Sequence, residues 1–147
     1  MNVLLVVQLV LVGLLAGEEF IVRWGVQRAI SRLPDDVHVR TRIALVKTLK
    51  VVVPILIVSA VLASIAVVVA DWSPWRIGGM VSLVVFVLAS FLGTVPINIG
   101  VNDWDPAAPP ANWKQTVRKW ERIDVLRSTA AGVGFVLFTV ALVAQLG

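Results

Sequence analysis

Residues 51–70 read VVVPILIVSAVLASIAVVVA, a run of 20 residues without a charged side chain. A helix needs about 20 largely apolar residues to cross the hydrocarbon core of a bilayer, so this run is long enough to span a membrane. The whole chain of 147 residues is 59% hydrophobic and has a mean hydropathy of +0.92, whereas soluble domains are about 45 to 50% apolar. The sequence therefore predicts an integral membrane protein.

Three further apolar runs approach the same length, at residues 2–22, 77–97 and 128–146. The first run has no charge before Glu18 and lacks the basic segment that begins a secretory signal, so we expect it to remain as a span. No change in composition divides the chain. We predict an all-α fold, a single integral membrane four-helix bundle over residues 1–147 with short amphipathic helical extensions on the cytoplasmic side.

The basic residues predict the orientation of the spans. Seven Lys and Arg lie between the first two spans and five between the last two, but only Arg76 lies between the second and third. Since Lys and Arg accumulate in short cytoplasmic loops, both termini should be extracytoplasmic, in a multi-pass protein of the cell membrane. Residues 38–50 and 113–127 should extend spans two and four as helices, with Asp36 and Asn112 as caps.

Several classes of function are disfavoured. The formal charge of +4 and the pI near 10.4 reflect the loop cations, so we predict no nucleic-acid binding. The chain has no cysteine, and zinc-protease, nucleophile-elbow, phosphate-loop and dinucleotide motifs are absent from it. His38 is its one histidine, and we interpret it as a solvated loop side chain. We therefore predict neither a metal site nor an organic cofactor.

Two acidic residues, Glu18 and Glu19, lie inside the first apolar run. Such groups cost about 2.5 to 3.5 kcal/mol each to insert, so they normally face protein or a wet cavity. One interpretation pairs Glu19 with Arg23 and takes Glu18 to the interface; the other places both in a cavity. Gly13 and Gly17 form a GxxxG step on the same helix, which we interpret as helix packing.

Prolines occur in two of the predicted spans. Pro54 and Pro96 should kink or end spans two and three. A break at the sequence TVPIN would free backbone carbonyls, and such breaks often line cavities. Asn98 and Asn102 follow it at helical spacing, so they lie either beside a cavity or simply at the end of the helix.

The segment WKQTVRKWERIDVLRS (113–128) is an amphipathic helix just before the fourth span. Helical spacing places one set of side chains together: Trp113, Val117, Trp120, Asp124 and Arg127. The other side carries Lys and Arg that suit anionic lipid headgroups. A carboxylate on the aromatic face needs a partner, and Arg127, three residues after Asp124, is the nearest cation on that face.

Three stretches resemble the anthrone-oxygenase-like family of small four-span membrane proteins. They are LLAGEEFIVRWGVQRAI (14–30), GTVPINIGVNDWDPAAPPANW (93–113) and VRKWERIDVLR (117–127). The shared features are the small-residue first span, the VP-x-N break, the loop ending in Trp, and a W-x-x-x-[HD]-x-x-R helix. The sequence differs from the frequent pattern at two positions, where Gln27 and Asp124 stand in place of His.

The resemblance implies oxidation of anthrone-type aromatics by molecular oxygen as co-substrate, without a bound flavin or metal. By motif it points to Gly17, Asn98, Asn102, Trp113, Trp120, Asp124 and Arg127. Such chemistry needs a base, and burial of Asp124 or Glu18 would provide one, with Arg127 stabilising the anion formed. If Asp124 and Arg127 instead neutralise each other, the base is lost.

Two functions stay open on the sequence alone. One is a membrane oxygenase of an apolar aromatic or quinone-like small molecule. The other is a non-enzymatic bundle that binds lipid or a partner protein and carries its polar residues for packing and topology. Membrane lipids are expected partners in both cases, and a homo-oligomer is compatible with both. An enclosed pocket beside Glu18 and Asp124 would favour the ligand site, whereas fully paired charges in a closed core would favour the structural role.

Overall fold

The computed structural model describes residues 2–147, and the chain in that range folds as helices joined by short loops. Its elements follow the chain as α1 (Asn2–Ile21), η1 (Val22–Val26), α2 (Gln27–Ile30), α3 (Asp35–Ala70), α4 (Pro74–Ala89), η2 (Ser90–Thr94), α5 (Val95–Asn102) and α6 (Trp113–Leu146). The elements η1 and η2 are π-helical turns. No strand occurs in residues 2–147, so the predicted all-α fold is confirmed.

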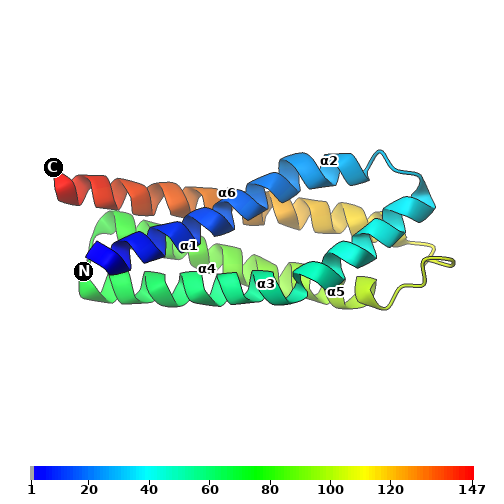
Figure 1. Ribbon diagram of the computed structural model, residues 1–147, viewed down its shortest axis with the longest axis horizontal. Helices are drawn as coiled ribbons and strands as arrows, with labels where there is room; N and C mark the ends of the chain where they lie inside the picture. Colours follow the sequence, from blue (N-terminus) through cyan, green and yellow to red (C-terminus); the bar gives the residue numbers. More distant parts are fainter. Residues whose placement is uncertain (1) are drawn as a thin grey trace.

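These elements form four long helices packed lengthwise (Figure 1). They are Val3–Ile30, Asp35–Ala70, Pro74–Asn102 and Trp113–Leu146, each long and apolar enough to cross a membrane. The shortest has 28 residues, and at 1.5 Å per residue every helix exceeds a hydrocarbon core of about 30 Å. The multi-pass membrane bundle is therefore confirmed, and the segments at 38–50 and 113–127 extend spans two and four as helices.

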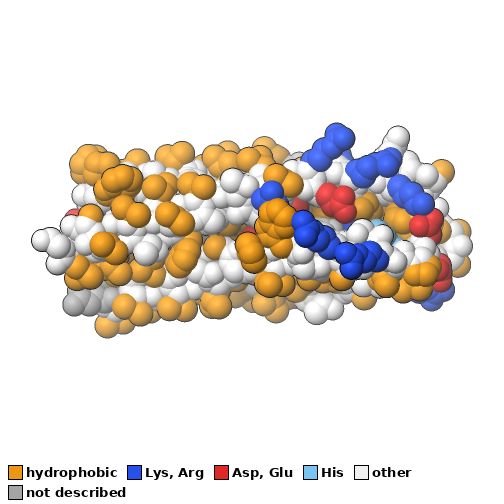
Figure 2. All heavy atoms as spheres, turned by 90° about the horizontal axis from the view of Figure 1, so that it is seen from above, with side chains coloured by type: hydrophobic (Ala, Val, Ile, Leu, Met, Phe, Trp, Pro, Cys, Tyr) orange, Lys and Arg blue, Asp and Glu red, His pale blue; other side chains and the backbone are white. Residues whose placement is uncertain are grey.

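Both termini lie at one end of the bundle, and the loops after α2 and α5 lie at the other (Figure 1). Lys and Arg side chains gather near this second end, while hydrophobic side chains cover the rest of the visible face (Figure 2). The Lys and Arg residues that predict the topology thus lie near one end of the folded bundle (Figure 2). The cytoplasmic location of the basic end stays a prediction.

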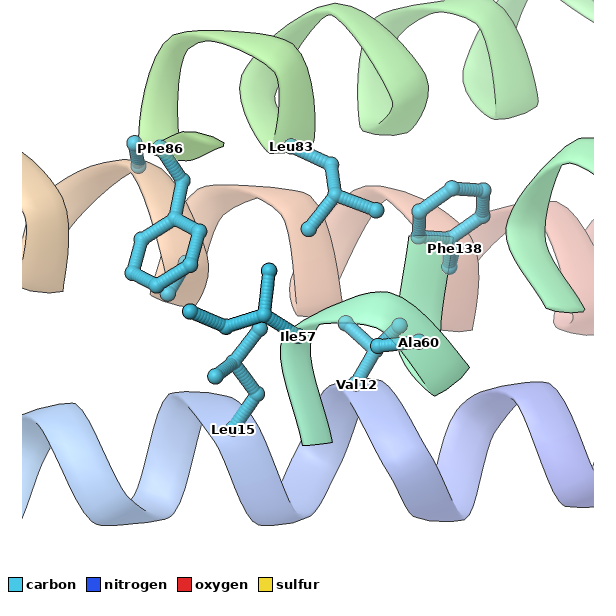
Figure 3. Packing of buried hydrophobic residues seen from close by; sticks show 9 residues of the cluster. Val12, Leu15, Ile57, Ala60, Leu83, Phe86 and Phe138 are labelled. Atoms are coloured by element: carbon cyan, nitrogen blue, oxygen red, sulfur yellow. The ribbon is translucent and has the colours of Figure 1, made fainter. Parts of the chain in front are cut away.

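The main core lies where all four long helices meet (Figure 3). Its buried members include Val12 and Leu15 from α1, Ile57 and Ala60 from α3, Leu83 and Phe86 from α4, and Phe138 from α6. In a bilayer the lipid tails are as apolar as these side chains, so close packing rather than transfer from water holds the helices together.

Helices α4 and α6 approach closely at a pair of glycines. A Cβ atom on Gly79 would lie 2.9 Å from the Phe138 ring, and one on Gly134 would lie 3.4 Å from the carbonyl oxygen of Gly79. The GxxxG step of α1 is used only in part: a Cβ on Gly13 would meet Phe135 at 3.1 Å, whereas Gly17 has nothing within 4 Å. Packing therefore explains Gly13 but not Gly17.

Neither proline ends its helix. Pro54 lies inside α3, and Pro96 lies in α5 directly after η2. A proline has no N–H to donate, and a π-helical turn beside it changes the hydrogen-bonding register without breaking the helix. The sequence suggested a break here, but the third span continues through Pro96 to Asn102.

Of the two predicted caps, Asp36 is wrong, and Asn112 occupies the predicted position without a side-chain hydrogen bond. Helix α3 begins at Asp35 with Pro34 at its N-cap, so Asp36 lies in the first turn. Asn112 does occupy the N-cap position of α6, but its side chain accepts no hydrogen bond there. Its backbone carbonyl accepts instead from the amides of Gln115 and Thr116, at 3.0 and 3.1 Å.

Candidate functional site

A cavity of about 390 Å³ lies in the half of the bundle that carries the basic loops. This volume is within the range of about 300 to 1,000 Å³ that small-molecule sites occupy. Its walls are mainly aliphatic: Val22, Val26, Leu45, Leu49, Val53, Ile57, Ile97 and Val101. Polar side chains lie at two levels along the helices, which we call the inner end, nearer the main core, and the outer end, nearer the loops.

Arg127 of α6 is the centre of a buried network at the inner end. Its Nη2 lies 2.5 Å from Oε1 of Glu19 and its Nη1 lies 3.5 Å from Oδ1 of Asp124. Its Nε donates a 2.8 Å hydrogen bond to Oγ of Ser90, which itself donates to the carbonyl of Phe86. Three different long helices therefore meet at one guanidinium.

The inner end contains more acidic than basic groups. Glu18 also lines the cavity, but it makes no ion pair with any described residue. Among the described residues, no group donates a hydrogen bond to Oε2 of Glu18, Oε2 of Glu19 or either oxygen of Asp124. Three carboxyl groups thus lie near one guanidinium, which pairs with only two of them, and burial makes an uncompensated negative charge costly. The cluster is suited to accept and hold a proton.

The alternative pairing of Glu19 with Arg23 is wrong. Nη1 of Arg23 donates instead to Oγ of Ser128 at 3.1 Å and to Oγ1 of Thr129 at 3.2 Å. Arg23 is thereby fixed against α6, beside the residue that does pair with Glu19. The long-range partner, Arg127, lies 108 residues away in the sequence.

Arg42 of α3 occupies the outer end. Its Nη2 donates to Oε1 of Gln27 at 3.1 Å and lies 3.3 Å from Nε2 of His38. Its guanidinium lies over the ring of Trp120, 4.9 Å from the ring centre. Arg42, Gln27 and Trp120 line the cavity, as do Asn98 and Asn102 of α5.

His38 is not a solvated loop residue, as the sequence suggested. It lies in the first turn of α3 and is only 8% exposed. Its ring meets Trp113 edge-on, with ring centres 5.1 Å apart and planes at 70°. The residues that the structure describes contain no group of three or more His, Asp or Glu positioned to hold a metal ion.

Comparison with known families adds independent evidence on this helical bundle. The family model described as anthrone oxygenase matches residues 43–137, which is more than half of the chain. The chain belongs to the anthrone oxygenase family. A search of curated proteins and a search of solved structures each gave no match.

The match to the anthrone oxygenase family includes several polar residues of the site. Ser90, Asn98, Asn102, Trp120, Asp124 and Arg127 all lie within residues 43–137. Glu18, Glu19, Gln27 and Arg42 precede residue 43. The acidic residues of α1 and the cation of α3 are therefore placed at the site by this structure rather than by the family match.

The structure brings most of the predicted site residues of this anthrone oxygenase family member into one place. Those that line the cavity are Glu18, Asn98, Asn102, Trp120 and Arg127. Asp124 is 1% exposed and contacts Arg127, but it is not part of the cavity wall. Gly17 is exposed, and a Cβ atom at its position would have no neighbour within 4 Å, so it takes no part in the site.

Several polar residues of the cavity wall are not among the predicted site residues, and Glu19, Gln27 and Arg42 are the most important of them. The sequence leaves Glu19 either in a local ion pair or in a cavity, and it indicates Arg42 only as a topology signal and Gln27 only as a replaced histidine. The sequence offers one signal at these three positions, which is a polar side chain next to apolar residues. Glu19 pairs with Arg127, and Gln27 with Arg42, across different helices, and no local pattern indicates either pair.

Proposed function

We propose that the protein oxygenates an apolar aromatic or quinone-like substrate with molecular oxygen inside this cavity. One observation supports the proposal most directly: an acidic residue without an ion pair, Glu18, faces an apolar cavity beside the guanidinium of Arg127. Membership of the anthrone oxygenase family indicates the reaction class. An apolar cavity beside incompletely paired acids also favours a ligand site over a purely structural bundle.

The reaction proposed is the conversion of an acidic methylene group between aromatic rings into a carbonyl. A base removes one proton, and the carbanion transfers an electron to oxygen; the two radicals combine into a hydroperoxide anion, which is then protonated. Loss of the second methylene proton breaks the O–O bond, forms the carbonyl and releases hydroxide, which takes a proton to become water. One oxygen atom stays in the product and the other leaves as water, so atoms and electrons balance.

Glu18 is the residue that we assign as the base. It lines the cavity and has no cationic partner among the described residues, so its carboxylate is free to take a proton. Glu19 and Asp124 hold Arg127 on two sides and act as positioning residues. Arg127 then stabilises the negative charge that develops on substrate or oxygen, because preorganised donors act strongly in a site that excludes water.

The substrate is proposed to arrive from the bilayer. Pro54, Val95 and Ile99 line the cavity and are also exposed on the outside of the bundle, so the cavity reaches the surface between α3 and α5. Ile99 is 63% exposed and Val95 is 39% exposed. Because both side chains are aliphatic, this opening suits an apolar molecule dissolved in lipid.

Oxygen uptake by the protein in lipid nanodiscs tests the proposal, with an anthrone as substrate and empty nanodiscs to correct for spontaneous oxidation. We expect Glu18→Gln to lower the rate by about 100-fold or more, since a positioned general base contributes about 10² to 10⁴. The matched control is Asp36→Asn, an exposed acid outside the cavity.

Three results would contradict parts of this proposal. No enzymatic uptake by the wild-type protein with any anthrone would reject oxygenation. Normal turnover by Glu18→Gln together with a loss in Asp124→Ala would transfer the role of base to Asp124, whereas normal turnover by Asp124→Ala would remove Asp124 from the mechanism.

A further inference from the structure

Arg42 differs from the other buried arginines of the bundle. Arg76 has Asp71 at 2.5 Å and Arg127 has Glu19 at 2.5 Å. Arg42 is only 5% exposed, yet no carboxylate of the residues described comes within 4 Å of it. Burying an ionised side chain is costly unless an opposite charge or several hydrogen bonds compensate it. Arg42 is therefore a buried positive charge at the outer end of the cavity with no described carboxylate in ion-pair contact, and the one acid that lines the cavity near it, Asp103, is exposed.

The environment of Arg42 holds its guanidinium in one orientation. Trp120 lies under its face, while Gln27 and His38 lie at Nη2. The nearest acidic groups, Glu121 and Asp124, act on it only from beyond ion-pair distance. A guanidinium that is held in one orientation and has no protein anion beside it is arranged as expected for a residue that binds an anionic ligand.

Hydrogen-bond donors at the outer end also lack acceptors. Nε of Arg42 and Nε2 of Gln27 are buried, and among the described residues neither donates a hydrogen bond. Both side chains line the cavity. Buried donors are nearly always satisfied in native proteins, so an acceptor supplied by a ligand is the simplest explanation of the pair.

We propose that the cavity binds a rigid aromatic ligand carrying an anionic oxygen group, a carboxylate or a phenolate, and that Arg42 and Gln27 hold this group at the outer end. The ligand body lies against the aliphatic walls and its other end faces Glu18 and Arg127. Trp120 and Arg127 are seven residues apart on α6, which corresponds to about 10 Å of helix. A ligand of about that length reaches both ends.

The surface opening is consistent with an anionic ligand. Lys50 lines the cavity and is exposed on α3, two turns after Arg42 in the direction of Pro54. An amphipathic acid approaching along the bilayer interface would meet this cation first. The anionic group could belong to a free aromatic acid or to a lipid-derived acid, since both present the same carboxylate; the aromatic body is favoured because the walls enclose a compact volume.

This inference deepens the proposed function by giving the substrate an acidic group, but binding alone tests it. The probes are anthracene-2-carboxylate and its neutral analogue 2-(hydroxymethyl)anthracene, titrated by fluorescence into the full chain in nanodiscs of zwitterionic lipid. Empty nanodiscs correct for partitioning. We expect the wild-type protein to bind the carboxylate about tenfold more tightly or better, because hydrogen bonds to charged groups are the stronger ones.

Substitution at Arg42 should remove this preference. Arg42→Gln is expected to weaken carboxylate binding by about tenfold or more and to change binding of the neutral probe by less than about threefold. Arg40→Gln is the matched control, since Arg40 is exposed on the same helix and outside the cavity. Arg42→Lys keeps the charge and should keep part of the preference if Arg42→Gln does not fold.

Equal wild-type affinity for the two probes would overturn the inference, and so would an equal loss of both in Arg42→Gln. Tighter binding of dodecanoate than of anthracene-2-carboxylate would reject the aromatic ligand and indicate a lipid-derived acid. These outcomes are separable from oxygenation. Arg42-dependent binding without oxygen uptake would keep the anion site and reject the proposed function. Oxygen uptake that Arg42→Gln leaves unaffected would keep the proposed function and reject the anion site.

Discussion

Arg127 should be the residue whose loss destabilises the bundle most. Replacement by Gln removes the ion pairs with Glu19 and Asp124 and the hydrogen bond to Ser90 in one step. Glu19 and Asp124, each 1% exposed, would then remain buried without a cation. Removing one partner of a buried pair costs about 3 to 5 kcal/mol, and we expect Arg127→Gln to lower the free energy of unfolding by that amount.

Reversible unfolding in bicelles or mixed micelles, followed by circular dichroism, measures this loss. Arg23→Gln is the matched control, because Arg23 makes no ion pair with a described residue. It hydrogen-bonds the hydroxyl groups of Ser128 and Thr129 and lies over the Trp24 ring, so its loss should cost about 1 kcal/mol. The double variant Glu19→Gln with Arg127→Gln removes one of the charges left without a partner, so it should be more stable than Arg127→Gln alone. The reasoning is refuted if Arg127→Gln costs less than its control, or if the second substitution restores nothing.

Three further expectations follow from other parts of the bundle. Val53→Trp should abolish probe binding by filling the cavity, whereas Val58→Trp on the exposed side of α3 should leave it unchanged; the same fluorescence titration shows both. Gly79→Val should cost about 1 to 3 kcal/mol of unfolding free energy by overpacking against Phe138, whereas Gly100→Ala, with no neighbour within 4 Å, should cost nothing measurable. Reporter fusions should place Gly147 outside and the loop at Ala108 in the cytoplasm, and the reverse pattern would contradict the predicted topology.

The membrane bundle was predictable because its signals are local. Hydropathy over about 20 residues identifies a span wherever it lies in the chain. The predicted spans are shorter than the helices because the flanking segments are polar, yet α3 and α6 continue through them as regular helix. The amphipathic face of α6 was also predictable, and Trp113, Asp124 and Arg127 are buried as its spacing indicates.

The site was predictable only where partners are neighbours in sequence. Arg127 and Asp124 are three residues apart, and the contact between them was expected. Glu19 with Arg127, and Gln27 with Arg42, join different helices, so spacing carries no information on either pair. His38 shows the same limit: a lone histidine near a loop is usually solvated, but here Trp113 of another helix covers it.

The two π-helical turns explain why regular helical spacing does not identify the cavity wall. Glu19 and Gln27 are eight residues apart across η1, and Ser90 and Asn98 are eight apart across η2. In a regular α-helix, side chains at that spacing would point about 80° apart. Each π-helical turn takes up extra residues, so both members of each pair face the same cavity. On each of these two helices, the polar groups of the inner and outer ends thus face the cavity because the helix changes register between them. A substitution that restored regular α-helix at η1 should turn Gln27 away from Arg42 while leaving Glu19 with Arg127.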